Sequence, residues 1–104
     1  MFIDILTDTV VAKQETPKNR FVKIDGSMGA TTTPFGVTRY GGETNENIDV
    51  MAVGIAQVEV ATGVTVVVGD FVASDIDGKA VVDNINGKFL AKTGGTKLIE
   101  VLLR

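Results

Sequence analysis

The segment Gly69-Asp-Phe-Val-Ala-Ser-Asp-Ile-Asp-Gly-Lys-Ala-Val-Val82 is the stretch from which the fold of this chain is inferred. Two runs of β-forming residues flank Asp77-Gly78, and an Asp-Gly pair in that setting is a strong short-range hairpin signal. We expect a type I′ turn, in which both central residues have a positive φ that Gly adopts without steric cost. The sequence therefore predicts two short strands joined at Asp77-Gly78.

Turn signals recur through the rest of the chain at intervals of roughly 8 to 12 residues. From Ile48 to Val60 apolar residues of one parity alternate with polar ones, which predicts a strand with one buried face. Gly54 interrupts this run and favours a bulge, a bend or a change of strand over an unbroken strand of thirteen residues. A turn at Thr62-Gly63 leads into the apolar run 64–68. The face predicted to be buried in the first run consists of Ile48, Val50, Ala52, Ala56, Val58 and Val60.

The last element, Lys97-Leu-Ile-Glu-Val-Leu-Leu-Arg104, alternates in the same way and is typical of a half-buried antiparallel strand. No stretch predicts a helix. Short strands between frequent turns are typical of a sandwich or a small closed barrel. The predicted fold class is all-β, a small barrel or sandwich of short antiparallel strands with an extended N-terminal arm.

Composition excludes several classes of function. The length of 104 residues fits one domain. The net charge is −3 and both signs are scattered along the chain, so there is no basic patch of the kind that binds nucleic acid. No run approaches the roughly 18 apolar residues of a membrane span. The chain has no His and no Cys, so the commonest general base and the thiolate metal ligands are missing. We expect no cofactor, no direct nucleic-acid partner and no membrane partner.

Residues 1–20 differ from the rest of the chain, because an apolar segment is followed by the polar run 12–20. We predict an arm and linker over 1–20, ahead of a β-domain over 21–104. The arm's apolar residues fit neither a strand nor a helix period, so a strand and an irregular extended segment both stay open. Such a segment commonly pairs with a partner's sheet edge or groove, and packing on its own domain is the alternative. The candidate partner-contact residues are Phe2, Ile3, Ile5, Leu6, Val10 and Val11.

Four acidic residues of the hairpin region resemble a cation site at first sight, but their spacing does not fit an EF-hand. Placing Gly78 at the sixth position of that loop puts Ala73 first and Asn84 twelfth, so both anchoring carboxylates are missing. We therefore expect solvated structural carboxylates at Asp70, Asp75, Asp77 and Asp83.

Enzymatic residues are equally scarce. Ser27 and Ser74 have no His or Cys to form a conventional triad. Paired-carboxylate glycosidase sites usually include aromatic residues, and this chain has no Trp and one Tyr. Phe35 and Tyr40 flank the polar loop 41–47, which leaves a small β-module that binds a ligand or glycan through Phe35–Asn47 as the alternative function. We predict no catalytic residues, no metal site and no enzyme.

The hairpin segment, with Lys97-Leu-Ile-Glu-Val-Leu-Leu103 and the preceding Gly54-Ile-Ala-Gln-Val-Glu-Val60, resembles the C-terminal half of the capsid decoration, or cement, proteins of tailed bacteriophages. The similarity covers roughly residues 35–104 and lies in turn and strand patterning. Where members of that family often have a short Ala/Gly-rich N-terminal part, this chain has Phe2–Arg20 and the loop Thr31-Thr-Thr-Pro34.

The resemblance implies a compact β-domain that binds the outside of an assembled icosahedral head, usually as a trimer at three-fold or quasi-three-fold positions, and strengthens it. The implied partners are the major capsid protein and two further copies in a homotrimer. The implied location is the outer surface of the capsid in the virion, and the host cytoplasm before assembly.

Overall fold

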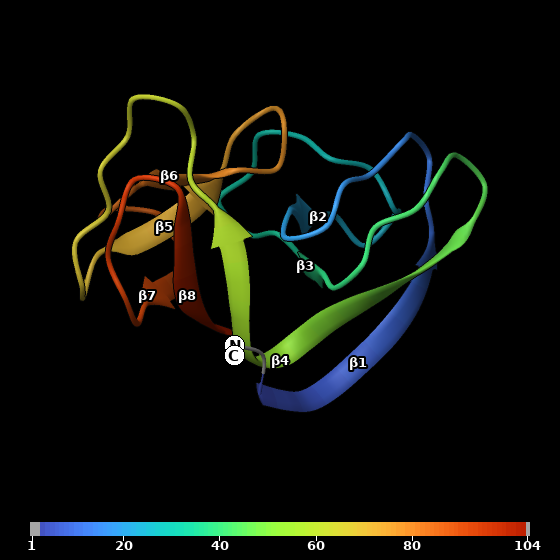
Figure 1. The fold of residues 1–104 in the computed structure, drawn as a ribbon, viewed down its shortest axis with the longest axis horizontal. Coiled ribbons are helices and arrows are strands. Elements are labelled where there is room, and N and C mark those ends of the chain that lie inside the picture. Colours follow the sequence, from blue (N-terminus) through green and yellow to red (C-terminus); the bar gives the residue numbers. More distant parts are fainter. Residues whose placement is uncertain (1–2, 104) are drawn as a thin grey trace.

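The computed structural model describes residues 3–103 and, within them, eight β-strands (Figure 1). No helix of membrane-spanning length and hydropathy occurs in this part of the chain. The all-β prediction is confirmed. The strands are β1 (Ile3–Val11), β2 (Phe21–Val22), β3 (Gly36–Thr38), β4 (Asn47–Glu59), β5 (Phe71–Ser74), β6 (Ala80–Val82), β7 (Phe89–Ala91) and β8 (Leu98–Leu103).

The strands form one antiparallel sheet in the order β2-β3-β4-β8-β7-β5-β6, and β1 pairs with β4 beside this path. The sheet curls until its two ends meet. The Phe21 amide at the start of β2 donates to the Gly78 carbonyl in the β5–β6 loop at 2.7 Å. A further bridge joins Thr31 to Ser74 on β5. Of the two predicted architectures, the structure adopts the nearly closed barrel.

The barrel encloses one large apolar cluster, and a smaller one lies beside it under the first half of β4. In the large cluster the rings of Phe21 and Phe89 stack with centroids 5.9 Å apart. Aromatic stacking of this kind adds to the stabilisation from buried area. The smaller cluster consists of Ala12, Val22, Ile48 and Val50, with Val10, Met28 and Phe35 packed against it.

β4 bends sharply along its length while remaining a single strand of 13 residues (Figure 1). Gly54 has φ +133° and is paired with Asp4 of β1 and Leu103 of β8, so β4 changes partner there. Met51 and Ala56 lie five positions apart but join the same core cluster, which requires the strand to exchange faces between them. A bend, one of the three predicted alternatives, is present, but the unbroken thirteen-residue strand that the sequence disfavoured is present as well. The predicted burial of Ala52 is wrong, because before the bend Met51 faces the large cluster and Ala52 is half-buried.

The predicted hairpin is confirmed, with Ser74 opposite Ala80 and Val72 opposite Val82. The predicted type I′ turn is wrong, because Gly78 has φ +76° and Asp77 has no positive φ. The loop is wider than two residues. The Gly78 amide donates to the Asp75 carbonyl at 3.1 Å, and the Asp75 amide donates to the Lys79 carbonyl at 2.9 Å.

The apolar run 64–68 forms no strand. Val66 is buried and makes an isolated bridge with Gly95, whereas the side chains of Val67 and Val68 are 61% and 66% exposed. Within this run Val66 belongs to the large cluster and the partly buried Val64 packs against it, so the two residues anchor the run to the core without a strand.

Candidate functional site

The N-terminal arm is the candidate contact site, and its first described element is strand β1. β1 pairs antiparallel with β4 from Ile3 opposite Ile55 to Val11 opposite Asn47, with register irregularities around Leu6. Among the described residues β4 is the only strand that pairs with β1, so its second edge carries no strand. The question left open by the sequence is answered for residues 3–11, which form a strand.

The six candidate contact residues fall in different surroundings. Phe2 lies outside the described residues, and Ile3, Ile5 and Leu6 belong to the backbone of β1. Val10 is partly buried against the smaller cluster, and Val11 is 51% exposed. Five of the six residues thus lie on one strand. Val10 is partly buried whereas Val11 is exposed to solvent, so these two side chains have different surroundings. Their role in partner contact stays a prediction.

The polar run after β1 is bonded to the body of the barrel. The Ala12 amide donates to the Glu46 carbonyl at 2.9 Å, and Thr16 exchanges two backbone hydrogen bonds of 2.8 Å with Gly42. Ala12 and Thr16 are both buried. The division into an arm over 1–20 and a β-domain over 21–104 stays a prediction, and these bonds are what a deletion of the linker removes.

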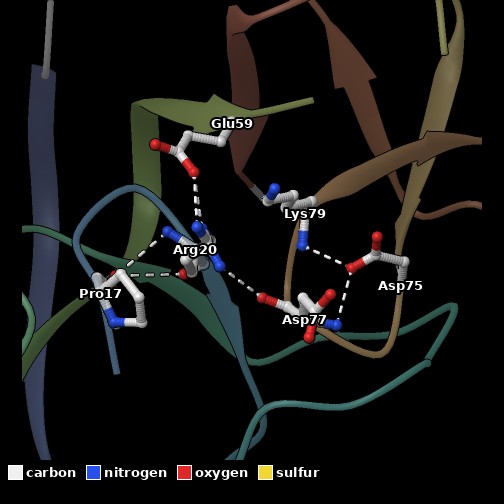
Figure 2. A network of polar contacts seen from close by, with 7 residues as sticks. Pro17, Arg20, Glu59, Asp75, Asp77 and Lys79 are labelled. Carbon is white, nitrogen blue, oxygen red and sulfur yellow. Dashed lines mark hydrogen bonds and ion pairs between the residues drawn. The ribbon is translucent and has the colours of Figure 1, made fainter. Parts of the chain in front are cut away.

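Arg20 is the last residue of the linker. Its side chain lies at the seam of the barrel, where the start of β2 meets the β5–β6 loop (Figure 2). Its Nε and Nη2 lie 2.8 Å and 2.7 Å from Oε2 of Glu59 at the end of β4. Its Nη1 donates to the Asp77 carbonyl at 3.0 Å. One guanidinium therefore joins β2, β4 and the β5–β6 hairpin, a geometry that the rigid fork of Arg can satisfy and the single ammonium of Lys cannot.

Three of the four carboxylates of the hairpin region, those of Asp70, Asp75 and Asp83, accept hydrogen bonds from the backbone of their own turns. Asp75 Oδ1 accepts from the amides of Asp77 and Lys79 at 2.9 and 2.8 Å. Asp83 Oδ1 accepts from the Asn86 amide at 2.9 Å, and Asp70 Oδ2 accepts from the Val67 amide at 3.0 Å. Such contacts are typical of turn-forming Asp residues. Residues 3–103 contain no group of three or more acidic, His or Cys side chains placed to hold a metal ion.

The two serines are likewise held by local contacts. The Ser74 hydroxyl is buried and lies 3.0 Å from the carbonyl oxygen of Gly29. The Ser27 hydroxyl donates to Asp25 Oδ1 at 2.6 Å, and the Ser27 amide donates to the same oxygen at 3.0 Å. These two hydrogen bonds favour the ionised form and lower the pKa of Asp25.

Two surface pockets lie away from the region of the alternative ligand site. One, of about 520 Å³, is lined by residues that include Glu59, Lys79 and Lys97, and the other, of about 410 Å³, by residues that include Ile55 and Leu102. Phe35 packs against the smaller cluster. Tyr40 is 73% exposed, with the Arg39 guanidinium 5.6 Å from its ring centroid. A ligand site over Phe35–Asn47 stays a prediction, and neither pocket includes it.

Comparison with known proteins connects this barrel to bacteriophage particles. The structure is similar to the crystal structure of the N base of the head fiber gp8.5 of bacteriophage phi29, with a TM-score of 0.67 and 17% sequence identity. The match covers 100% of this chain and 95% of that one, which shows a shared fold. No curated protein matches the sequence. The family of phage cement proteins matches residues 3–101, and the chain belongs to this family of phage structural proteins.

Proposed function

We propose that this chain binds the outer surface of the assembled phage head as a homotrimer and stabilises it, with the major capsid protein as its partner. The observation that carries the proposal is the family match over residues 3–101, which includes β1 as well as the barrel. The proposed role is structural and not catalytic. The protein would wait in the host cytoplasm before assembly and then become part of the virion.

The edge of β1 supports a contact role for the arm. A strand of nine residues whose second edge pairs with no described strand offers unpaired backbone donors and acceptors to an incoming strand. The bonds of Ala12 and Thr16 fix the base of this strand to the barrel. We propose that the arm, through Phe2, Ile3, Ile5, Leu6, Val10 and Val11, contacts the major capsid protein or a neighbouring subunit.

Stabilisation follows from mass action. A protein that binds the assembled shell and not its separated subunits shifts the equilibrium toward the shell. A trimer that bridges adjacent capsomers engages several sites at once, so that modest contacts add up through high effective concentration. Many bound copies would thereby raise the barrier to rupture.

The test combines two measurements on the full chain. Light scattering coupled to size-exclusion chromatography gives the oligomeric state, and cosedimentation with expanded shells that lack their decoration protein gives binding. We expect a trimer that cosediments and that raises the temperature at which shells release DNA. A chain that stays monomeric and does not cosediment contradicts the proposal.

A further inference from the structure

A row of large apolar side chains crosses the outside of the barrel. The strand registers place Phe71 of β5 opposite Leu90 of β7, Leu90 opposite Leu102 of β8, and Leu102 opposite Ile55 of β4. We call Phe71, Leu90, Leu102 and Ile55 the outer row. In the same register Ile3 of β1 stands opposite Ile55, so the row leads to the strand proposed for partner contact.

The outer row faces away from the core. Leu102 lies between Val101 and Leu103, both buried in the large cluster, and Leu90 lies between the buried Phe89 and Ala91. Since side chains of a strand alternate between faces, Leu102 and Leu90 point outward. All four members of the outer row are half-buried.

The neighbouring outward positions are polar, as the outside of a small barrel normally is. Gln57 of β4 stands opposite Glu100 of β8, and Glu100 faces Lys92 with 3.7 Å between Oε1 and Nζ. Outward-facing side chains on a small barrel are normally polar, so an apolar row on this face departs from the expected pattern. Contiguous apolar side chains that remain partly accessible to solvent commonly mark an interaction surface.

The outer row also borders a groove. Ile55, Leu90 and Leu102 line a hollow of about 410 Å³ together with Val68, Gly69, Ala91 and Lys92. The Gly69 amide donates to the Ala91 carbonyl at 3.0 Å, which fixes the exposed Val68 beside Leu90. A groove of this size accepts one or two apolar side chains, and such anchors carry much of the binding energy at protein interfaces.

In the proposed trimer, the net charge of the chain favours an uncharged face for the contact between copies. Each copy carries a net charge of −3, so two copies repel each other on average. The outer row has no charged member, and its bordering Lys92 faces Glu100 of the same chain. Like-charged copies therefore meet with least repulsion across the outer row, and its continuity with β1 places the contact next to the arm.

We infer that the outer row is the interface between copies of this chain, with the groove beside Val68 filled by an apolar side chain of the next copy. The inference rests on the proposed trimer and adds the face through which it forms. The polar row of Gln57, Glu100 and Lys92 would form the wetter rim that such interfaces normally have.

The test compares Leu102→Lys with Leu98→Lys in the full-length chain. Both leucines lie on β8 and point outward, four positions apart, and Leu98 is outside the row and 43% exposed. Lysine reduces the net negative charge, so weaker association cannot arise from added repulsion. We expect the dissociation constant from sedimentation equilibrium to rise at least about tenfold for Leu102→Lys and to stay near wild type for Leu98→Lys.

The outcomes separate this inference from the proposed function. If Leu102→Lys leaves the oligomer intact, or reduces only cosedimentation with shells, the outer row is not the interface between copies while the decoration role stands. A wild-type chain that remains monomeric overturns the inference. Failure to bind shells at all counts against the decoration role instead.

A second measurement covers the case in which Leu102→Lys fails to fold. The sequence has no Cys, so Leu102→Cys and Leu98→Cys introduce single thiols. We expect the thiol at 102 to react slowly with a maleimide dye at high protein concentration and faster on dilution, and the thiol at 98 to react at one rate throughout. A rate at 102 that is independent of concentration overturns the inference.

Discussion

Arg20 and Glu59, 39 positions apart in the sequence, are joined by two nitrogen–oxygen contacts of 2.8 and 2.7 Å at the seam of the barrel (Figure 2). The Arg20 side chain is 15% exposed and also holds the Asp77 carbonyl. Arg20→Lys keeps the positive charge, but one ammonium group cannot contact both Glu59 and the Asp77 carbonyl as the guanidinium does. We expect this substitution to reduce the free energy of unfolding by about 1 kcal/mol. Urea unfolding followed by circular dichroism measures this loss.

The matched control for Arg20 is the pair of Lys92 and Glu100, whose atoms are 3.7 Å apart with the Lys92 side chain 48% exposed. A single contact of this length from a solvent-exposed ammonium contributes little, so we expect Lys92→Ala to cost less than about 0.5 kcal/mol even though the Glu100 side chain is 17% exposed. Equal losses for the two variants would contradict a special role of Arg20 in closing the barrel.

Gly78 is required twice at the same seam, by its conformation and by its neighbours. It has φ +76°, and a Cβ at this position would lie 2.6 Å from the Phe21 carbonyl oxygen. Gly63 has a similar φ of +82° with nothing within 4 Å of its Cβ position. We expect Gly63→Ala to cost about 1–2 kcal/mol from backbone strain, and Gly78→Ala to cost about 1–3 kcal/mol more from overpacking. Thermal unfolding of both variants checks the difference, and equal losses would show that the contact with Phe21 is relieved at no cost.

Truncation locates the end of the separable arm. We expect a chain of residues 10–104 to fold, because Val10 and the buried residues Ala12 and Thr16 remain, and to bind shells at least about tenfold more weakly. We expect residues 21–104 to unfold without cooperativity, because Arg20 and the bonds of the linker are lost. Cooperative urea unfolding of 21–104 at the stability of 10–104 would show instead that the whole segment 1–20 is a tether.

The turn at Asp25 gives a prediction about pH. Hydrogen bonds from the hydroxyl and amide of Ser27 lower the pKa of Asp25 in the folded state. Stability from this ionised group is present above the unfolded-state pKa and is lost as the pH falls through the folded-state pKa. We expect Ser27→Ala to raise the pKa of Asp25, measured by carboxyl-detected NMR titration. We expect Ser27→Ala to lower the free energy of unfolding near neutral pH, where Asp25 is ionised, and to have no such effect in strong acid, where Asp25 is protonated.

The elements that could be predicted from the sequence are those set by local patterns. The Asp-Gly signal located the β5–β6 hairpin, and alternation in β8 placed Ile99, Val101 and Leu103 in the core. Gly54 marked the bend of β4 because a strand that changes partner needs a backbone that side chains rarely permit.

The elements that could not be predicted depend on contacts between distant segments. The turn at Asp77-Gly78 differs from a two-residue hairpin because Gly78 must also receive the Phe21 amide from β2. The outer row could not be predicted from the sequence, because its four members lie on four different strands. They become neighbours only through the register in which those strands pair. Leu102 did leave a signal, since it is a large apolar residue on the outward parity of β8.

The shared pairing of Gly54 with Asp4 and Leu103 brings both ends of the described chain to one point of the molecule (Figure 1). An orientation that presses the start of β1 against the head also turns the C-terminal end toward it, so cargo fused there would compete with docking. The loop 41–47 joins β4 at the end where Val11 stands opposite Asn47, roughly 20 Å along the strand. If the start of β1 is the part that docks, a peptide displayed in that loop stands farther from the head than one fused at either end.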